Sequence, residues 1–199
     1  MASSLKITEE EIDDLLYSAR AGETEDLSTL LAALADREKV SPAEILASAK
    51  DEGKSTCLHM ATGNGHTEIV KIIISHFTNQ PKETKQAFFD APNEYGNTGL
   101  HWAALGGHLD VVKLLVEEGG ATPALANDKN YVPLDLAYQA EKLDVANYFL
   151  EKAGMLEGQN GDEALGNAVA DVKLDEEDGD RDEGEEVVEA SIAEGEVAR

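Results

Sequence analysis

Apolar residues in the central part of the chain recur at spacings of three and four, which is typical of short amphipathic helices. Two successive stretches follow this spacing, with apolar positions at Leu58, Ala61, Val70, Ile73 and Ile74 and then at Leu100, Ala103, Val112 and Leu115. Glycines at 63, 65, 106 and 107 interrupt both stretches. Glycine suits a tight turn because it tolerates positive φ. The pattern therefore predicts pairs of short helices, each pair joined by a glycine turn.

The two stretches are also near copies of each other. Residues 56–62 read Thr-Cys-Leu-His-Met-Ala-Thr, and residues 98–104 read Thr-Gly-Leu-His-Trp-Ala-Ala. Each is followed by Gly-His, an acidic residue and an apolar stripe. This internal repeat resembles the ankyrin repeat, whose signature is T-P-L-H-x-A. The resemblance implies an all-α solenoid with hairpin-like fingers between its helical pairs, and an extended surface for binding proteins.

Weaker copies flank the two clear ones. Leu134 lies 34 residues after Leu100, and there Asp135 replaces the histidine of the signature. Upstream, residues 12–34 have helical spacing without the signature, and Ser41-Pro42-Ala43-Glu44 has the form of a capping box that opens another short helix. Terminal repeats are expected to be atypical because one face meets water. We predict a flexible N-terminus at residues 1–8 and four repeats, at 9–50, 51–92, 93–126 and 127–153.

The second repeat is longer than usual. His59 and His101 are 42 residues apart, whereas the ankyrin period is about 33. The surplus falls within residues 75–91, which predicts an enlarged hairpin finger there. Of the adjacent Phe88 and Phe89, we expect one to pack inward.

The polar residues of the signature favour structural roles. Thr56 and Thr98 stand where an N-cap hydroxyl would satisfy free amides of the following helix. The resemblance implies that His59 and His101 bond to neighbouring backbone. The alternative is a metal site, since His59, His66, His101 and His108 form pairs seven residues apart. The chain offers one cysteine and no clustered second ligand set, so we expect no metal and no other cofactor.

Cys57 occupies the position where the signature has proline. A buried framework thiol is the expected role there, rather than a nucleophile, because free cysteines behave mostly as small apolar residues. A single cysteine also provides no disulfide framework, which favours a reducing compartment.

Charge divides the chain. The net charge is −25, and residues 157–199 hold 16 acidic and 3 basic residues. Low hydrophobicity and high charge predict a disordered acidic tail over residues 154–199. Such a tail either solubilises the protein or attracts a basic partner. Direct binding of nucleic acid is disfavoured because it requires a basic footprint. We expect no membrane association, since no apolar run reaches spanning length and no signal-peptide core is present.

A narrower resemblance is carried by four features: residues 15–22 (Leu-Leu-Tyr-Ser-Ala-Arg-Ala-Gly), residues 96–103 (Gly-Asn-Thr-Gly-Leu-His-Trp-Ala), the long second finger and the acidic end. Over residues 8–153 the chain resembles the small fungal ankyrin-repeat chaperones dedicated to ribosomal protein S-three of the small subunit. The resemblance implies that it captures newly made, basic ribosomal protein, keeps it soluble and accompanies it from cytoplasm to nucleus. It also implies a monomer, or a heterodimer with the client.

In ankyrin stacks the concave face is formed by the finger tips and the first helix of each pair. Trp102 is the only tryptophan and a typical binding anchor, with packing between repeats as the alternative. Glu52, Glu94 and Asp128 recur at one finger position, where they either pair with Arg or Lys of a partner or are ordinary solvated turn residues. The predicted partner-binding residues are Glu52, Met60, Gly63, Asn64, Glu94, Tyr95, Trp102, Leu105, Asp128, Tyr131 and Gln139.

Three other functions compete with the chaperone. The first is a generic ankyrin adaptor for a transcription or signalling protein, and the second is an acidic histone chaperone. The third is an enzyme, which the sequence disfavours because it has no phosphate loop, nucleophile elbow or convergent pair of carboxylates. We therefore expect no catalytic residues.

Overall fold

The computed structural model describes residues 5–159, which form helices joined by turns; residues 1–4 and 160–199, and with them most of the predicted acidic tail, lie outside the described residues. Within residues 5–159 there is no strand, and the predicted all-α class is confirmed. The helices are α1 Glu9–Ala21, α2 Thr24–Glu38, α3 Pro42–Ser48, α4 Cys57–Gly63, α5 Thr67–Phe77, α6 Lys82–Phe89, α7 Gly99–Gly106, α8 Leu109–Lys113, the π-helix η1 Leu114–Gly119, α9 Pro133–Gln139 and α10 Leu143–Gln159.

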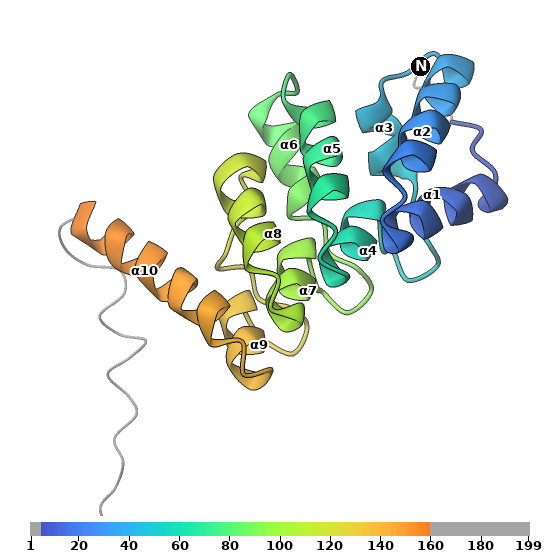
Figure 1. Ribbon diagram of the computed structural model, residues 1–199. Helices are drawn as coiled ribbons and strands as arrows, with labels where there is room; N and C mark the ends of the chain where they lie inside the picture. Colours follow the sequence, from blue (N-terminus) through green and yellow to red (C-terminus); the bar gives the residue numbers. More distant parts are fainter. Residues whose placement is uncertain (1–4, 160–199) are drawn as a thin grey trace, which may run out of the picture. The chain divides into compact units, whose positions relative to one another are not determined.

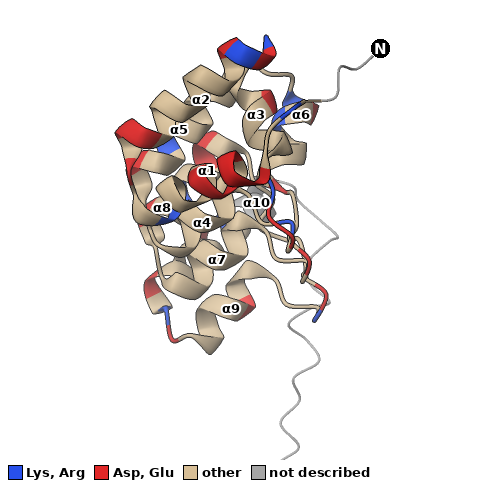
Figure 2. Ribbon diagram, turned by 90° about the vertical axis from the view of Figure 1, so that its right-hand side faces the viewer, with Lys and Arg blue, Asp and Glu red and all other residues tan. Residues whose placement is uncertain are grey.

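Four helical pairs follow one another through the fold: α1 with α2, α4 with α5, α7 with α8 and η1, and α9 with α10 (Figure 1). The first helices contact each other in succession, α1 on α4, α4 on α7 and α7 on α9. The second helices α2, α5 and α8 form a parallel row beside them (Figures 1 and 2). We call α1, α4, α7 and α9 the inner helices. None of the helices between residues 5 and 159 has the length and apolar composition needed to cross a bilayer.

The core lies between the two rows of helices, and the apolar spacing of the sequence accounts for it. Positions of the two copied stretches are buried throughout: Leu58, Ala61, Val70, Ile73, Leu100, Ala103, Val112 and Leu115. The first pair contributes Leu15, Leu27 and Leu31, which are also fully buried. Burial of a leucine or isoleucine side chain stabilises a fold by about 1.5–3 kcal/mol, so these residues hold successive pairs together.

Local signals define where several helices begin. The Ser41 amide donates to the Glu44 carboxylate at 2.9 Å, and the Glu44 amide donates back to the Ser41 hydroxyl at 3.3 Å. This capping box opens α3, so the short helix predicted at Ser41-Pro42 is confirmed. Thr8 and Glu11 form an equivalent box at the start of α1, with distances of 2.9 and 3.2 Å.

The surplus residues of the second repeat form a helix, and the prediction of an enlarged hairpin finger is wrong. Residues 82–89 make α6, and Phe88 and Phe89 are both buried, not one of them. Phe77 of α5 explains this, because its ring stacks on Phe88 with centroids 4.2 Å apart and meets Phe89 edge-on at 5.6 Å. Phe88 and Phe89 also meet edge-on at 5.3 Å, so the three rings form one buried aromatic cluster.

The last helix is longer than predicted. The fourth repeat was expected to end at residue 153, yet α10 continues to Gln159. The boundary was placed before Gly154, but one glycine inside a helix costs only about 1 kcal/mol relative to alanine and does not by itself end it.

Candidate partner-binding surface

Three finger turns connect the helical pairs. In each finger a residue with a short polar side chain closes the turn: Asp51 Oδ1 accepts from the Ser55 amide at 2.7 Å, and Asn93 Oδ1 accepts from the Asn97 amide at 3.0 Å. Asn127 repeats this bond with the Tyr131 amide at 3.0 Å. The backbone of each turn is closed as well, for example from the Asn93 amide to the Asn97 carbonyl at 2.9 Å.

Neighbouring fingers are joined tip to tip. The Glu94 amide donates to the Gly53 carbonyl at 2.8 Å, and the Asp128 amide donates to the Tyr95 carbonyl at 3.2 Å. These bonds hold three acidic side chains along one edge of the stack, and all three are exposed: Glu52, Glu94 and Asp128. The Glu94 carboxylate lies beside the exposed Tyr95 hydroxyl and raises the pKa of that phenol.

The signature histidines fix each finger to the inner helix before it. His59 Nδ1 accepts from the Thr56 amide at 3.1 Å, so Nε2 carries the hydrogen and donates to the Asn97 carbonyl at 3.0 Å. His101 is bonded in the same way to Thr98, and its Nε2 reaches the Tyr131 carbonyl at 3.0 Å. The histidines therefore set the positions of the second and third fingers.

Thr56 and Thr98 are the N-cap residues of α4 and α7, as the sequence predicts, and each forms a capping box with the histidine three residues later. The Thr56 hydroxyl lies 3.0 Å from His59 Nδ1, and the Thr98 hydroxyl lies 2.9 Å from His101 Nδ1. In the last pair Asp135 replaces histidine, and its carboxylate accepts from the Val132 amide at 2.9 Å.

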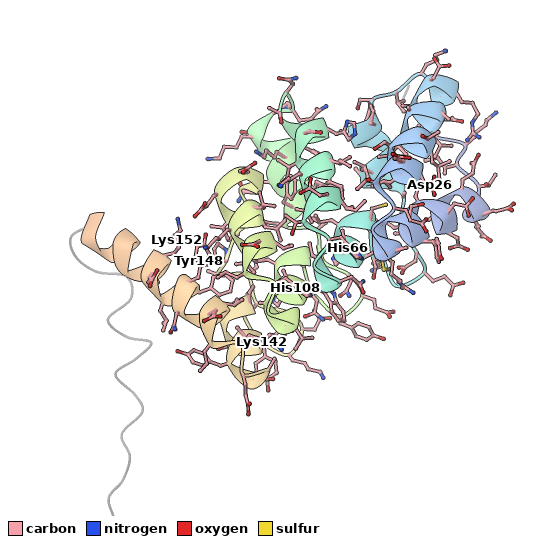
Figure 3. All side chains as sticks on the ribbon, in the orientation of Figure 1. Asp26, His66, His108, Lys142, Tyr148 and Lys152 are labelled. Carbon is pink, nitrogen blue, oxygen red and sulfur yellow. The ribbon has the colours of Figure 1, made fainter. Side chains whose placement is uncertain are left out.

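His66 and His108, which follow the glycine turns, bind the turn of the preceding pair. His66 Nε2 lies 2.7 Å from the Arg20 carbonyl, and His108 Nε2 lies 3.2 Å from the Gly63 carbonyl. Their rings cover Gly22 and Gly65, whose φ values of 79° and 74° favour glycine. Lys142 takes the same place over Gly107 (Figure 3). Within the described residues no three His, Cys, Asp or Glu side chains are grouped to hold a metal ion, and burial raises the pKa of the Cys57 thiol to about 12.

Burial makes the stack sensitive to acid. It lowers the pKa of both His59 and His101 below the value of about 6.5 in an unfolded chain. The unfolded state then binds protons first, so the stabilising contribution is present above about pH 6.5 and is lost as the pH falls through and below that value. We expect the melting temperature, measured by circular dichroism, to fall between about pH 7.5 and about pH 5.5.

Histidine variants test whether His59 and His101 cause this pH dependence. His59→Gln with His101→Gln is expected to flatten this profile more than His76→Gln does, because His76 is only partly buried. An unchanged slope in the double variant would show that other groups cause the acid sensitivity.

The inner helices supply the second part of the predicted surface. Trp102 on α7 is half-buried, and its Cε3 lies 3.9 Å from the position that a β-carbon on Gly63 would take. Leu105 and Gln139 are exposed, and Met60 is half-buried against the core. Asn64 is exposed, but its side-chain amide donates to the Met60 carbonyl at 2.8 Å and closes the end of α4.

Two residues of α1 belong to the same surface and were not predicted. Tyr17 precedes Gly22 by the same number of residues as Met60 precedes Gly65 and Trp102 precedes Gly107. The three residues therefore occupy equivalent positions in their helices, and we call such positions level. Arg20 is then level with Gly63 and Leu105. Tyr17 is exposed, and Arg20 Nη2 lies 3.2 Å from Met60 Sδ. The Ala21-Gly22 turn was the available signal in the sequence for these two residues. It marks the end of α1 and so gives the register of the first pair, which lacks the T-P-L-H motif.

Acidic residues of α1 extend the acidic edge formed by the finger tips. A hollow of about 640 Å³ lies between the start of α1 and the first finger. Figure 2 shows acidic residues on α1 and along the finger loops. The hollow is lined by Glu9, Ile12, Asp13, Lys50, Asp51, Glu52 and Gly53. We call the finger tips, this hollow and the exposed side of the inner helices the inner surface.

Stacked helical pairs, glycine turns and threonine–histidine pairs together define a repeat protein of one class. The family model for ankyrin repeats (3 copies) matches residues 15–119 and 83–162, and the chain belongs to the ankyrin-repeat family. It is similar to the ankyrin repeat-containing protein YAR1 of Saccharomyces cerevisiae, with 39% identity over 148 residues that cover 73% of this chain and 71% of that protein. It is also similar to a chain in the crystal structure of the yeast ribosomal protein Rps3 in complex with its chaperone Yar1. That similarity has 37% identity and a TM-score of 0.67, and it covers 74% of this chain and 95% of the other.

Proposed function

We propose that this protein is a dedicated chaperone of the small-subunit ribosomal protein Rps3, which it binds soon after synthesis and keeps soluble. The observation that carries the proposal is the 39% identity to YAR1 over 148 residues, which are 73% of this chain. The similarity to a chain of the Rps3–Yar1 complex supports the same client.

The inner surface suits such a client chemically. Ribosomal proteins are rich in Lys and Arg because they bind phosphate backbones. Carboxylates at the finger tips and at the start of α1 form charge-assisted hydrogen bonds with these side chains, while Tyr17, Met60 and Trp102 offer apolar contact beside them. A client bound in this way is shielded from stray nucleic acid, and ribosomal RNA competes for the same basic side chains at release.

The proposal includes a place of action. A chaperone that captures newly made ribosomal protein meets it in the cytoplasm, and ribosome assembly requires delivery to the nucleus, so we place the protein in both compartments as an escort without catalytic activity. Imaging of the tagged protein during a block of nuclear export is the test, and strict exclusion from the nucleus contradicts the escort role.

The client is identified by affinity purification of the tagged protein at moderate salt, followed by mass spectrometry. We expect one small-subunit ribosomal protein to dominate, and a 1:1 complex to form when the purified chain is mixed with yeast Rps3. Recovery of histones instead would support an acidic histone chaperone, and recovery of a transcription or signalling protein would support a generic adaptor.

Binding is expected to weaken strongly with salt. The screening length is about 10 Å at 0.1 M salt and about 3 Å at 1 M, so carboxylate contacts with Lys and Arg lose strength over this range. Titration calorimetry with yeast Rps3 at several salt concentrations measures the slope.

A charge-neutral variant of the finger tips provides the control for this slope. Glu52→Gln, Glu94→Gln and Asp128→Asn together are expected to lower the affinity at 0.1 M salt and to flatten the dependence. Affinity that does not change with salt would mean that apolar anchors dominate and that the electrostatic account is incorrect.

A further inference from the structure

The stack ends at α9 and α10 with apolar side chains in positions that other pairs bury. Tyr138 of α9 is level with Ala19, Thr62 and Ala104 of the preceding inner helices. Those three residues are fully buried, because the next inner helix covers them. Tyr138 is 49% exposed.

The same comparison holds for α10. Leu150 is level with Leu31 and Ile74, which are buried, and with Val116, which is partly buried against the core. Leu150 is 47% exposed, and Leu143, two turns earlier on the same side of the helix, is 61% exposed. We call Tyr138, Leu143 and Leu150 the end face. A terminal repeat normally carries polar residues there. We therefore expect a binding partner to cover this apolar group.

The charges around the end face are mostly negative. Glu141, Asp144 and Glu151 are exposed beside its three members. Two lysines lie nearby. The stem of Lys142 lies against Gly107, and Lys152 pairs with Glu117 at 2.9 Å on the opposite side of α10, beside Tyr148 (Figure 3). The net result is an apolar group with an acidic border.

A second copy of this chain is a poor occupant. Two end faces brought together would place Glu141, Asp144 and Glu151 of one copy near the same residues of the other, and like charges in contact are destabilising. The net charge of −25 adds to this repulsion at longer range.

We propose that the end face is a second binding site for the same basic client, which presents an apolar side chain flanked by Lys or Arg. Charge complementarity favours this occupant, as does continuity, because Gln139 of the inner surface directly follows Tyr138 on α9. The inference rests on the proposed function, since it assigns a further contact to the chaperone's client. The client therefore extends past the last finger and around the end of the stack.

The first experiment measures affinity for yeast Rps3 with the full chain. Tyr138→Gln, Leu143→Gln and Leu150→Gln are combined, because glutamine keeps helix propensity and adds no charge. We expect the dissociation constant to rise about tenfold, equivalent to about 1.4 kcal/mol. Ala33→Gln, at an exposed position of the outer helix α2, serves as the control and is expected to leave affinity unchanged.

The second experiment uses site-directed cross-linking and needs only a mild substitution. Leu150→Cys is labelled with a thiol-reactive photo-cross-linker, and the buried Cys57 is protected from the reagent. We expect a cross-link from position 150 to yeast Rps3 and none from Ala33→Cys.

The outcomes separate this inference from the proposed function. If wild type binds yeast Rps3, Trp102→Ala weakens binding and the end-face variant binds normally without a cross-link, the end face is not a client site while the chaperone function stands. If wild type dimerises in sedimentation experiments and only the end-face variant is monomeric, the occupant is a second copy and the inference is overturned. If wild type does not bind yeast Rps3, both proposals fall.

Discussion

Trp102→Ala is expected to weaken binding of the basic client about thirtyfold, while the stack remains folded. Central aromatic anchors contribute about 2 kcal/mol or more when truncated, which corresponds to that factor. Trp102 is half-buried, lies against Gly63 and stands level with the exposed Tyr17. Titration calorimetry with yeast Rps3 measures the loss of affinity, and thermal unfolding of the same variant measures stability.

Trp102→Phe is the matched control, because it keeps an aromatic ring in contact with Gly63 and is expected to retain most of the affinity. If Trp102 instead served only to pack one repeat on the next, Trp102→Ala would cost about 3–5 kcal/mol of stability. Trp102 is not among the residues that form the buried core, which favours the anchor. Normal binding together with normal stability would remove Trp102 from the surface.

Phe89→Ala is expected to lower the free energy of unfolding by about 3–5 kcal/mol, the usual cost of removing a buried phenylalanine side chain. Phe89 is fully buried at the end of α6, edge-on to Phe77 and Phe88. A β-carbon on Gly119 of η1 would lie 3.2 Å from its ring, so it also connects α6 to the third pair. Urea unfolding followed by circular dichroism measures the change.

Thr84→Ala, at an exposed position of the same helix, is the control and is expected to change stability by less than about 0.5 kcal/mol. A small effect of Phe89→Ala would mean that α6 opens without disturbing the stack, in which case the helix is an appendage and not part of the core.

Parts of the fold that repeat a clear local pattern were predictable from sequence. The copied Leu-His-x-Ala segments gave α4 and α7, and the capping signal at Ser41-Pro42 gave α3. Residues 82–89 contain no such signal, because Lys-Glu-Thr-Lys-Gln-Ala-Phe-Phe has only two apolar residues of any size and they are adjacent. Helix α6 forms because Phe77, at the end of the preceding helix, and Gly119, in the third pair, receive those two rings.

The inner surface was predictable where the register was marked. Thr56 and Thr98 fixed the counting for Trp102, Leu105 and the finger carboxylates, whereas the first pair has no such motif. Tyr17 and Arg20 of the first pair were missed for that reason. Tyr138 and Leu150 are exposed because the stack ends at α9 and α10. No local sequence pattern indicates where the stack ends, so their exposure could not be predicted.

The strictly sequential contacts between helices bear on how the chain acquires its structure. Among residues 5–159, the principal contacts join elements within one pair or between adjacent pairs. Short loops close quickly, and folds dominated by such local contacts form fast. Because synthesis begins at the N-terminus, α1, α2 and α4 are complete before α9 is translated. A newly made chaperone thus assembles its first binding residues during translation, and each later pair adds to an existing template.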